Sequence, residues 1–386
     1  MVGRHAAPRA PRAPRAPRRR AAVLAVVLVL VVAGATALFV NRPSATQSGL
    51  GSVATTTVAP IAVPPTTTTT SPVALTFAAV GDTDLGDTPL LPAVPSAEFA
   101  PVRPLLHADI SFANLEGTMT TGTASKCGAQ STSCYAFRVP PSYAQLYRVA
   151  GFTIVNSANN HSYDFGATGV AQTSAALHDA GIVQAGLPTQ IGYVTSHGIT
   201  VAFVDVAPYY LTNNMLDAAQ FAALMKRAKA HARLVVVYMH TGAEGSAADH
   251  VTRQSEYYFG ENRGNPYAFA HTAIDLGASL VLGSGPHVWR GMEWYKKHLI
   301  VYSMGDFTNY ESFSTYGNLS LTGVVHVTLS SSGRFLRGDI AAARFQPNGL
   351  VVPDASHALW PFVNALSHQD FGSSAALIGA SGAILP

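Results

Sequence analysis

The chain has 386 residues, of which 48% are hydrophobic and 12% charged, and its formal net charge is +3. Eight of its 24 basic residues precede residue 43, so the remainder carries 16 basic and 21 acidic residues, a net charge of −5. This distribution excludes a basic nucleic-acid-binding face on the main part of the chain.

Three segments at the N-terminal end differ in composition. Residues 1–20 contain seven arginines and no acid, and residues 21–40 are uncharged and rich in Val, Leu and Ala. Twenty helical residues rise about 30 Å, enough to cross a bilayer, so we expect a single membrane anchor with a cytoplasmic basic tail. The A-T-A sequence at 35–37 leaves a cleaved signal peptide as the alternative. The Thr- and Pro-rich residues 41–73 predict a disordered linker that holds an extracytoplasmic domain.

Apolar runs alternate with helical patterns along the rest of the chain. The runs that predict strands are 75–80, 109–113, 152–155, 234–239, 279–282 and 299–304, and the expected helices are 142–150, 170–180, 217–231 and 266–276. This alternation indicates an α/β domain with a largely parallel or mixed sheet covered by helices. Residues 321–329 and 333–345 predict an antiparallel hairpin, and residues 351–386 are expected to pack as a C-terminal strap.

The chain has two cysteines, Cys127 and Cys134, in a stretch rich in Gly, Ser and Thr. A location outside the membrane permits a disulfide, and we predict one. The spacing does not match a C-x2-C zinc clip.

Polar side chains gather where the predicted strands end. They are Asp82, Asn114, Glu116, Asn160, His161, His240 and His287. Oxygen and imidazole donors without a thiolate suit Mn, Fe, Zn or Mg, and two such ions can clamp a phosphoryl group. The alternative is that these residues are turn formers, because Asn, Asp and Gly favour turns.

Other polar residues leave two interpretations open. Asp84, Asp164, Glu244 and Asp306 either orient a ligand histidine or form turns. Arg290 is either an anion contact or a solvated side chain. The sequence contains neither a P-loop nor a dinucleotide-binding G-x-G-x-x-G motif. The absence of a G-x-S-x-G motif argues against a serine nucleophile.

Six ordered motifs carry a family resemblance. They read V-G-D-T-D-L-G, F-A-N-L-E-G, S-A-N-N-H-S-Y-D-F-G, Y-M-H-T-G-A-E-G, G-S-G-P-H-V and I-V-Y-S-M-G-D-F, and they resemble the CapA/PgsA family of poly-γ-glutamate capsule proteins over about residues 75–310. That family is similar to calcineurin-like metallophosphatases. The resemblance implies a four-layer α/β/β/α sandwich over residues 74–350, with a dinuclear metal site between the sheet ends.

The resemblance also implies roles for individual residues. The implied metal ligands are Asp82, Glu116, Asn160, His240 and His287. His161 is the implied catalytic or substrate-orienting imidazole, and we expect Asp164 to act with it and Asn114, Glu244 and Arg290 to contact substrate. Gly285 stands where relatives often carry a histidine ligand, so the second metal site lacks one implied donor. Asp306 stands where Asn is usual.

The expected function is that of a membrane-anchored protein in capsule or poly-γ-glutamate biosynthesis or export. Its metal site would bind or hydrolyse an anionic polymer or a phosphoester, and its partners would include a membrane polymer-synthesis complex but no nucleic acid. Two alternatives stay open: a general extracytoplasmic metal-dependent phosphoesterase, and a non-catalytic scaffold with a degenerate metal site.

Overall fold

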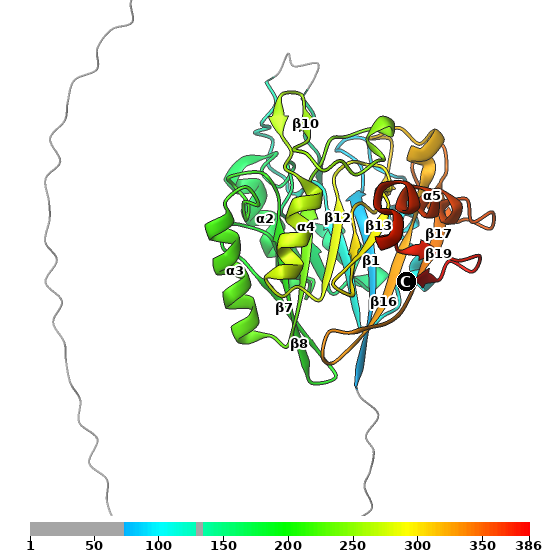
Figure 1. Ribbon diagram of the computed structural model, residues 1–386. Coiled ribbons are helices and arrows are strands. Elements are labelled where there is room, and N and C mark those ends of the chain that lie inside the picture. The colour runs from blue at the N-terminus through cyan, green and yellow to red at the C-terminus, as the bar shows by residue number, and fades with distance from the viewer. Residues whose placement is uncertain (1–72, 129–133) are drawn as a thin grey trace, which may run out of the picture. The chain divides into compact units, whose positions relative to one another are not determined.

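The computed structural model describes residues 73–128 and 134–386 (Figure 1). The predicted tail, the predicted membrane anchor and all but the last residue of the predicted linker lie outside these residues. Among the helices of the described residues, none combines the length and the hydropathy that a membrane crossing requires. The predicted disulfide between Cys127 and Cys134 is confirmed.

The first sheet has eight strands and is built around β1 (Ala74–Asp84). Its strands run in the order β18–β17–β16–β1–β2–β5–β6, and β15 pairs in parallel with the last residues of β1. The other strands of this sheet are β2 (Ile110–Leu115), β5 (Ile154–Asn156), β6 (Val183–Ala185), β15 (Asp306–Asn309), β16 (Leu321–Ser330), β17 (Phe335–Phe345) and β18 (Val351–Pro353). β16 and β17 pair antiparallel, which confirms the predicted hairpin.

The second sheet has six strands in the order β13–β14–β12–β9–β8–β7. The strands are β7 (Gly192–Ser196), β8 (Ile199–Val206), β9 (Leu234–His240), β12 (Leu280–Ser284), β13 (Met292–Tyr295) and β14 (His298–Val301). The four central strands are parallel and the two edge strands are antiparallel. β9 is buried along its whole length, as expected for a parallel strand covered on both faces.

Helices cover the outer face of each sheet. The first sheet packs against α1 (Ala144–Ala150) and α2 (Gly166–Asp179), and the second against α3 (Ala218–His231) and α4 (Pro266–Asp275). Local sequence sets their ends: Asp217 accepts a hydrogen bond from the backbone N–H of Gln220 at the start of α3, and Pro266 occupies the first turn of α4. All four predicted helices are confirmed, with small shifts at their ends.

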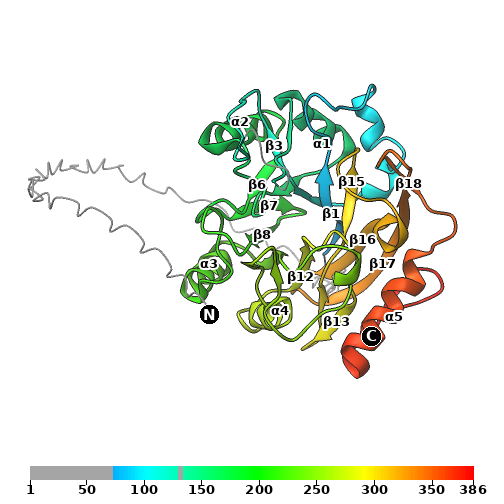
Figure 2. The ribbon, with the colours of Figure 1, turned by 90° about the horizontal axis from the view of Figure 1, so that it is seen from above.

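A continuous apolar core joins the two sheets. Phe112 of β2 stacks on Phe203 of β8 with ring centroids 5.6 Å apart, and Tyr238 of β9 also packs against the Phe112 ring. The layers therefore follow the predicted order of helix, sheet, sheet and helix (Figure 2).

The C-terminal residues contain an ordered helix that the sequence analysis did not predict. Helix α5 (Leu359–Phe371) buries Leu359 and Val363 in the core between the sheets, and β19 (Leu377–Ile378) pairs with β20 (Ile384–Leu385). The remaining short pairs are β3 (Thr118–Met119) with β4 (Arg138–Val139) and β10 (Tyr257–Tyr258) with β11 (Glu261–Asn262).

Candidate metal centre

The carboxyl ends of strands from both sheets meet at one place. The first sheet supplies Asp82 near the end of β1, Glu116 from just beyond β2, and Asp306, which begins β15 and pairs with Asp82. The second sheet supplies His240 at the end of β9 and His287 from just beyond β12. Ligand groups collect at this end of parallel strands in α/β sheets, and here two sheets contribute.

Asp82 and Asp306 approach each other because glycines bring their backbones together. The N–H of Asp82 donates to the carbonyl of Gly305 at 2.9 Å. A Cβ atom at Gly81 would lie 1.8 Å from that carbonyl oxygen, so only glycine fits at position 81. The glycines of the V-G-D and M-G-D motifs thus set the spacing of the two carboxylates.

Two groups of buried donors share Asp82. One consists of Asp82, His287 and Asp306, and the other of Asp82, Glu116 and His240. Within each group, the ligand atoms all lie within 4.8 Å of one another. A carboxylate common to two such groups is the arrangement expected of a residue that bridges two cations.

Hydrogen bonds fix the orientation of the Asp82 carboxylate. Its Oδ1 accepts from Asn114 Nδ2 at 2.7 Å and from the hydroxyl of Ser284, and its Oδ2 accepts from the N–H of Gly285 at 3.1 Å. Burial raises the pKa of Asp82, but the hydrogen bond with His287 and the nearby imidazoles outweigh it and lower the pKa to about 2. Asp82 is therefore ionised at neutral pH.

One carboxylate oxygen of Glu116 has the surroundings of a metal ligand. Its Oε1 is buried and has no hydrogen-bond partner among the described residues. This atom lies 3.7 Å from His240 Nε2, 4.0 Å from His161 Nε2 and 4.0 Å from His287 Nε2. Such separations are too long for hydrogen bonds but are within reach for donors that share a cation at about 2 Å from each.

The protein compensates the charge of the cluster only in part: burial lowers the pKa of His287, but Asp306 and Glu116 outweigh this effect and raise that pKa well above its usual range, so one imidazolium faces three carboxylates. Burial raises the pKa of Glu116 well above its usual range, and the negative charge of Asp82 adds to this effect. Burial likewise raises the pKa of Asp306 to about 6, although His287 opposes the shift. A buried carboxylate without a cationic partner is costly, and a divalent cation would supply the missing charge. The residues present therefore fit a metal site.

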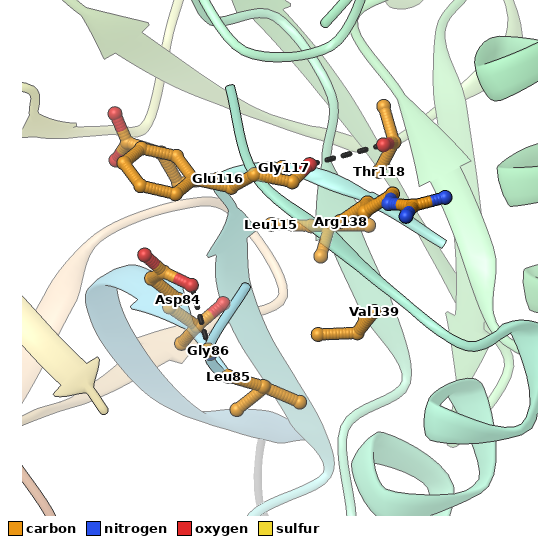
Figure 3. Close-up of a pocket in the computed structure, with 11 residues that line it drawn as sticks. Asp84, Leu85, Gly86, Leu115, Glu116, Gly117, Thr118, Arg138 and Val139 are labelled. Carbon is orange, nitrogen blue, oxygen red and sulfur yellow. Dashed lines mark hydrogen bonds between the residues drawn. The ribbon is translucent and has the colours of Figure 1, made fainter. Parts of the chain in front are cut away.

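Arg138 does not pair with Glu116, although both residues line one small cavity. The cavity has a volume of about 10 Å³, and Asp84, Glu116 and Arg138 all line it. Figure 3 shows the carboxyl groups of Asp84 and Glu116 on one side of this cavity and the Arg138 guanidinium on the other. Arg138 Nη1 instead donates to the carbonyl of Gly122 at 2.6 Å.

The imidazole of His287 is held by a carboxylate and an aromatic ring. Its Nδ1 lies 2.7 Å from Asp306 Oδ1, and its ring stacks on Phe313 with centroids 4.4 Å apart. The backbone of His287 has φ of 58°, a left-handed conformation that is uncommon for a histidine. The G-S-G-P-H turn thus directs the side chain into the cluster at some conformational cost.

Asn160 lies against the second group. Its Oδ1 is 3.0 Å from His240 Nε2. Burial lowers the pKa of His240 to about 3 despite the negative charge of Asp82, so this imidazole is neutral and its nitrogen can serve as a donor to a cation.

His161 and Asp164 form a pair at the edge of the cluster. His161 Nδ1 lies 2.8 Å from Asp164 Oδ2, and Lys126 Nζ lies 2.6 Å from Asp164 Oδ1. Because an ionised carboxylate can only accept, we assign the proton to Nδ1, which leaves Nε2 facing Glu116. Burial lowers the pKa of His161 and outweighs the opposing effect of Asp164, so the ring is neutral near pH 7.

The three residues expected to contact substrate have different positions. Asn114 is fully buried and orients Asp82, so it supports the cluster from behind. Glu244 lies at the site, with Oε2 3.8 Å from His287 Nε2 and Oε1 2.6 Å from Arg263 Nη1. Arg290 is 1% exposed and its guanidinium pairs with Glu256, which does not favour the expected substrate contact.

Several functional residues were not identified from the sequence. Asn156 and Asn159 both donate to Asn114 Oδ1, at 2.6 and 2.9 Å, and so force Asn114 Nδ2 to face the carboxylates. Ser284 holds Asp82, and Asp306 belongs to a donor group although the sequence left its role open. The three asparagines within residues 156–160 are the sequence feature that could have pointed to Asn156 and Asn159.

The glycine at position 285 lies at the cluster, as its alignment with an implied ligand suggests. A Cβ atom there would lie 3.2 Å from His240 Nε2, and φ at this residue is +110°. Position 285 thus adjoins the second donor group, which in this chain comprises Asp82, Glu116 and His240 with Asn160 beside it.

A pocket of about 840 Å³ opens above the cluster. Its lining includes Asn160, His161, Glu244, His287 and Asp306. Its volume falls within the range of small-molecule sites.

Solved structures with distant similarity include a hypothetical protein and a 5'-nucleotidase precursor, both from Thermus thermophilus. The first is 15% identical with a TM-score of 0.42, covering 69% of this chain and 98% of that one. The second is 15% identical with a TM-score of 0.38, covering 75% and 58%. Similarity at this level carries no conclusion about activity.

Sequence comparisons give a family. The PGA biosynthesis protein CapA of Bacillus subtilis (strain 168) is 30% identical over 201 residues, which cover 48% of this chain and 49% of that protein. The capsule biosynthesis protein CapA of Bacillus anthracis is 29% identical over 180 residues, covering 41% and 40%. This chain thus spans about half or less of the length of these relatives. Residues 76–311, more than half of the chain, match the family described as bacterial capsule synthesis protein PGA_cap, and the chain belongs to that family.

Proposed function

We propose that this protein is a membrane-anchored, extracytoplasmic component of capsule or poly-γ-glutamate biosynthesis or export, and that its buried cluster holds divalent metal ions that bind or hydrolyse an anionic substrate. The observation that carries the metal proposal is the pair of buried donor groups that share Asp82. Membership of the PGA_cap family supports the role in capsule synthesis.

The two donor groups suggest two ions. One ion would be held by Asp82, His287 and Asp306, and the other by Asp82, Glu116 and His240 with Asn160. Carboxylate, amide and imidazole donors suit Mn, Fe or Zn. When bound, such ions stabilise negative charge on a substrate and lower the pKa of bound water.

Residues of the chain itself orient groups and move protons around this centre. Asp164 holds His161 so that Nε2 faces the cluster, where it can accept a proton or orient a substrate oxygen. Lys126 neutralises Asp164 and also donates to the carbonyl of Asn160 at 3.0 Å. Asn114 and Ser284 keep Asp82 in place.

Surface polymer tests the physiological role. A strain that lacks the gene should lose cell-associated polymer, and the full-length chain should restore it, whereas an Asp82→Asn variant expressed at the same level should not. Asp339→Asn, a change at a half-exposed residue far from the cluster in sequence and paired with His326, serves as the matched control. Normal polymer in the Asp82→Asn strain would contradict the proposed role of the metal site. Recovery of the protein in the soluble fraction after cell lysis and removal of the membranes would contradict membrane anchoring.

The His161–Asp164 pair favours hydrolysis as a second candidate, a general metal-dependent phosphoesterase. A site that only binds an anion needs no oriented imidazole beside the donors. Mn-stimulated cleavage of a chromogenic phosphodiester that is lost in His161→Ala would support this activity. Metal binding without any turnover would leave a binding role, and well under one equivalent of metal after reconstitution would favour a scaffold.

A further inference from the structure

The walls of the 840 Å³ pocket differ in chemistry from its floor. We call the polar residues that the pocket shares with the cluster its floor, and the five aromatic side chains of its lining its walls: Tyr135, Tyr209, Tyr258, Phe259 and Phe313. Tyr135 is 61% exposed and Phe259 is 79% exposed. Large aromatic side chains gain free energy by burial, so a pocket lined by five of them, two of which are largely exposed, offers a surface that a ring-shaped ligand can cover.

The aromatic residues come from separate parts of the chain. Tyr258 and Phe259 lie on the β10–β11 hairpin, above the carboxyl ends of the central strands (Figure 1). Arg263 holds this hairpin in place through Glu244 and Glu261, at 2.6 and 3.1 Å, and its guanidinium lies over the Tyr258 ring at 5.4 Å. The wall is therefore fixed to the same residue, Glu244, that borders the floor.

The charges on the walls do not suit a polyanion. The lysine and the arginine that line the pocket within the described residues are both paired, Lys126 with Asp164 and Arg263 with two glutamates. Glu244 and Glu261 add negative charge to the lining. Attraction for an anion is thus confined to the floor once cations are bound there, and the walls would repel further carboxylates.

We infer that the pocket binds a ligand with one anionic group and an uncharged sugar ring, a phosphorylated saccharide, and not a stretch of polyglutamate. The anionic group lies at the floor and the ring lies against the aromatic walls. Tyrosine suits such a ligand because its ring contacts the apolar face of the sugar while its hydroxyl forms hydrogen bonds. The inference rests on the proposed function, because the floor must bind an anion.

Binding measurements separate the two parts of the pocket. Calorimetry on the full-length, Mn-loaded protein would compare inorganic phosphate, which reports the floor, with α-D-glucose 1-phosphate, which reports floor and walls together. We expect glucose 1-phosphate to bind at least about tenfold more tightly than phosphate, as aromatic stacking on a ring ligand allows. Tyr258→Ala and Phe259→Ala should each lower this ratio about five- to tenfold and leave phosphate binding unchanged.

Tyr210→Ala provides the matched control, because this tyrosine is 82% exposed and does not line the pocket. It should leave both affinities unchanged. Asp82→Asn should abolish binding of both ligands.

Three results would overturn the inference: equal affinity for the two ligands, no detectable binding of glucose 1-phosphate, or tighter binding of phenyl phosphate or a γ-glutamate pentamer than of glucose 1-phosphate. Failure of phosphate alone to bind, with glucose 1-phosphate still bound through the walls, would instead contradict the proposed function.

Discussion

Two sets of buried charged residues in this protein differ in how their charges are neutralised. Arg290 and Glu256 are 1% and 7% exposed, and they satisfy each other through contacts of 3.1 and 2.8 Å, while Arg290 Nε donates to the carbonyl of Ala248. In the candidate metal centre, Asp82, Glu116 and Asp306 are equally buried, but of the two imidazoles in their donor groups only His287 has a raised pKa, and His240 is neutral.

The difference shows what distinguishes a binding site from a structural ion pair. The Arg290–Glu256 pair needs nothing from outside the protein, because each charge has its partner. The metal centre keeps an unpartnered Glu116 oxygen and carboxylates with raised pKa values. Burial alone is common to both, so the missing compensation is the property that points to a ligand.

Replacing the shared carboxylate should have the largest effect. Asp82→Asn removes the residue common to both donor groups, so we expect both ions to be lost, with at least about 100-fold weaker Mn binding in equilibrium dialysis. The Asp339→Asn control should bind Mn as the wild type does. Retention of one tightly bound ion in Asp82→Asn would show that Asp82 does not bridge.

Breaking the ion pair should affect stability and not metal binding. Arg290→Met leaves Glu256 buried and unpaired, and we expect the free energy of unfolding to fall by about 3–5 kcal/mol in denaturant titrations. The double variant Arg290→Met/Glu256→Gln should recover part of this loss, because no unpaired charge remains. A change of less than about 1 kcal/mol would contradict the structural role assigned to the pair.

Glu98 shows how a buried carboxyl behaves with neither kind of partner. Both of its oxygens lack hydrogen-bond partners among the described residues, and burial together with Asp84 raises its pKa from 4.5 to about 8. The folded protein therefore binds a proton that the unfolded chain releases, and stability should fall as the pH rises from about 4.5 to 8.

The variant Glu98→Gln isolates this contribution. It should lose less stability than the wild type between pH 5 and pH 8, with a difference on the order of 3 kcal/mol in the free energy of unfolding. Parallel pH profiles of the two proteins would show that Glu98 does not titrate in this range.

Removing the amide behind Asp82 should weaken the metal centre without abolishing it. Asn114→Ala deletes the hydrogen bond to Asp82 Oδ1, and loss of such an orienting contact typically weakens metal binding about 10- to 100-fold. Dialysis against Mn below the unfolding temperature of the variant measures this. Affinity equal to that of the wild type would show that Ser284 and the N–H of Gly285 suffice to orient Asp82.

The sequence predicted elements whose signals are local. Helix α3 has a capping Asp217 and basic residues in its last turn, and the β16–β17 hairpin shows alternation, so both could be placed from their own residues. The order of layers came from the family resemblance. The C-terminal helix α5 was missed because its apolar face is set by packing against both sheets.

Residues of the site were predictable where a motif ends a strand, as at Asp82 and His240. The residues that hold these side chains in place could not be predicted, because their role depends on contacts between segments that are distant in the sequence. Asn156 reaches Asn114 across 42 residues, and Ser284 reaches Asp82 across 202. Arg290 shows the converse error: its place near His287 in sequence suggested an anion contact, but Glu256 from another loop pairs with it.

Anomalous diffraction at the manganese edge, on crystals of the Mn-loaded protein, would show directly whether the cluster holds two metal ions. We expect two peaks, one beside His287 and Asp306 and one beside Glu116 and His240, with Asp82 in contact with both. A map without a peak among these side chains, from protein that has been loaded with excess Mn, would contradict the proposed metal site.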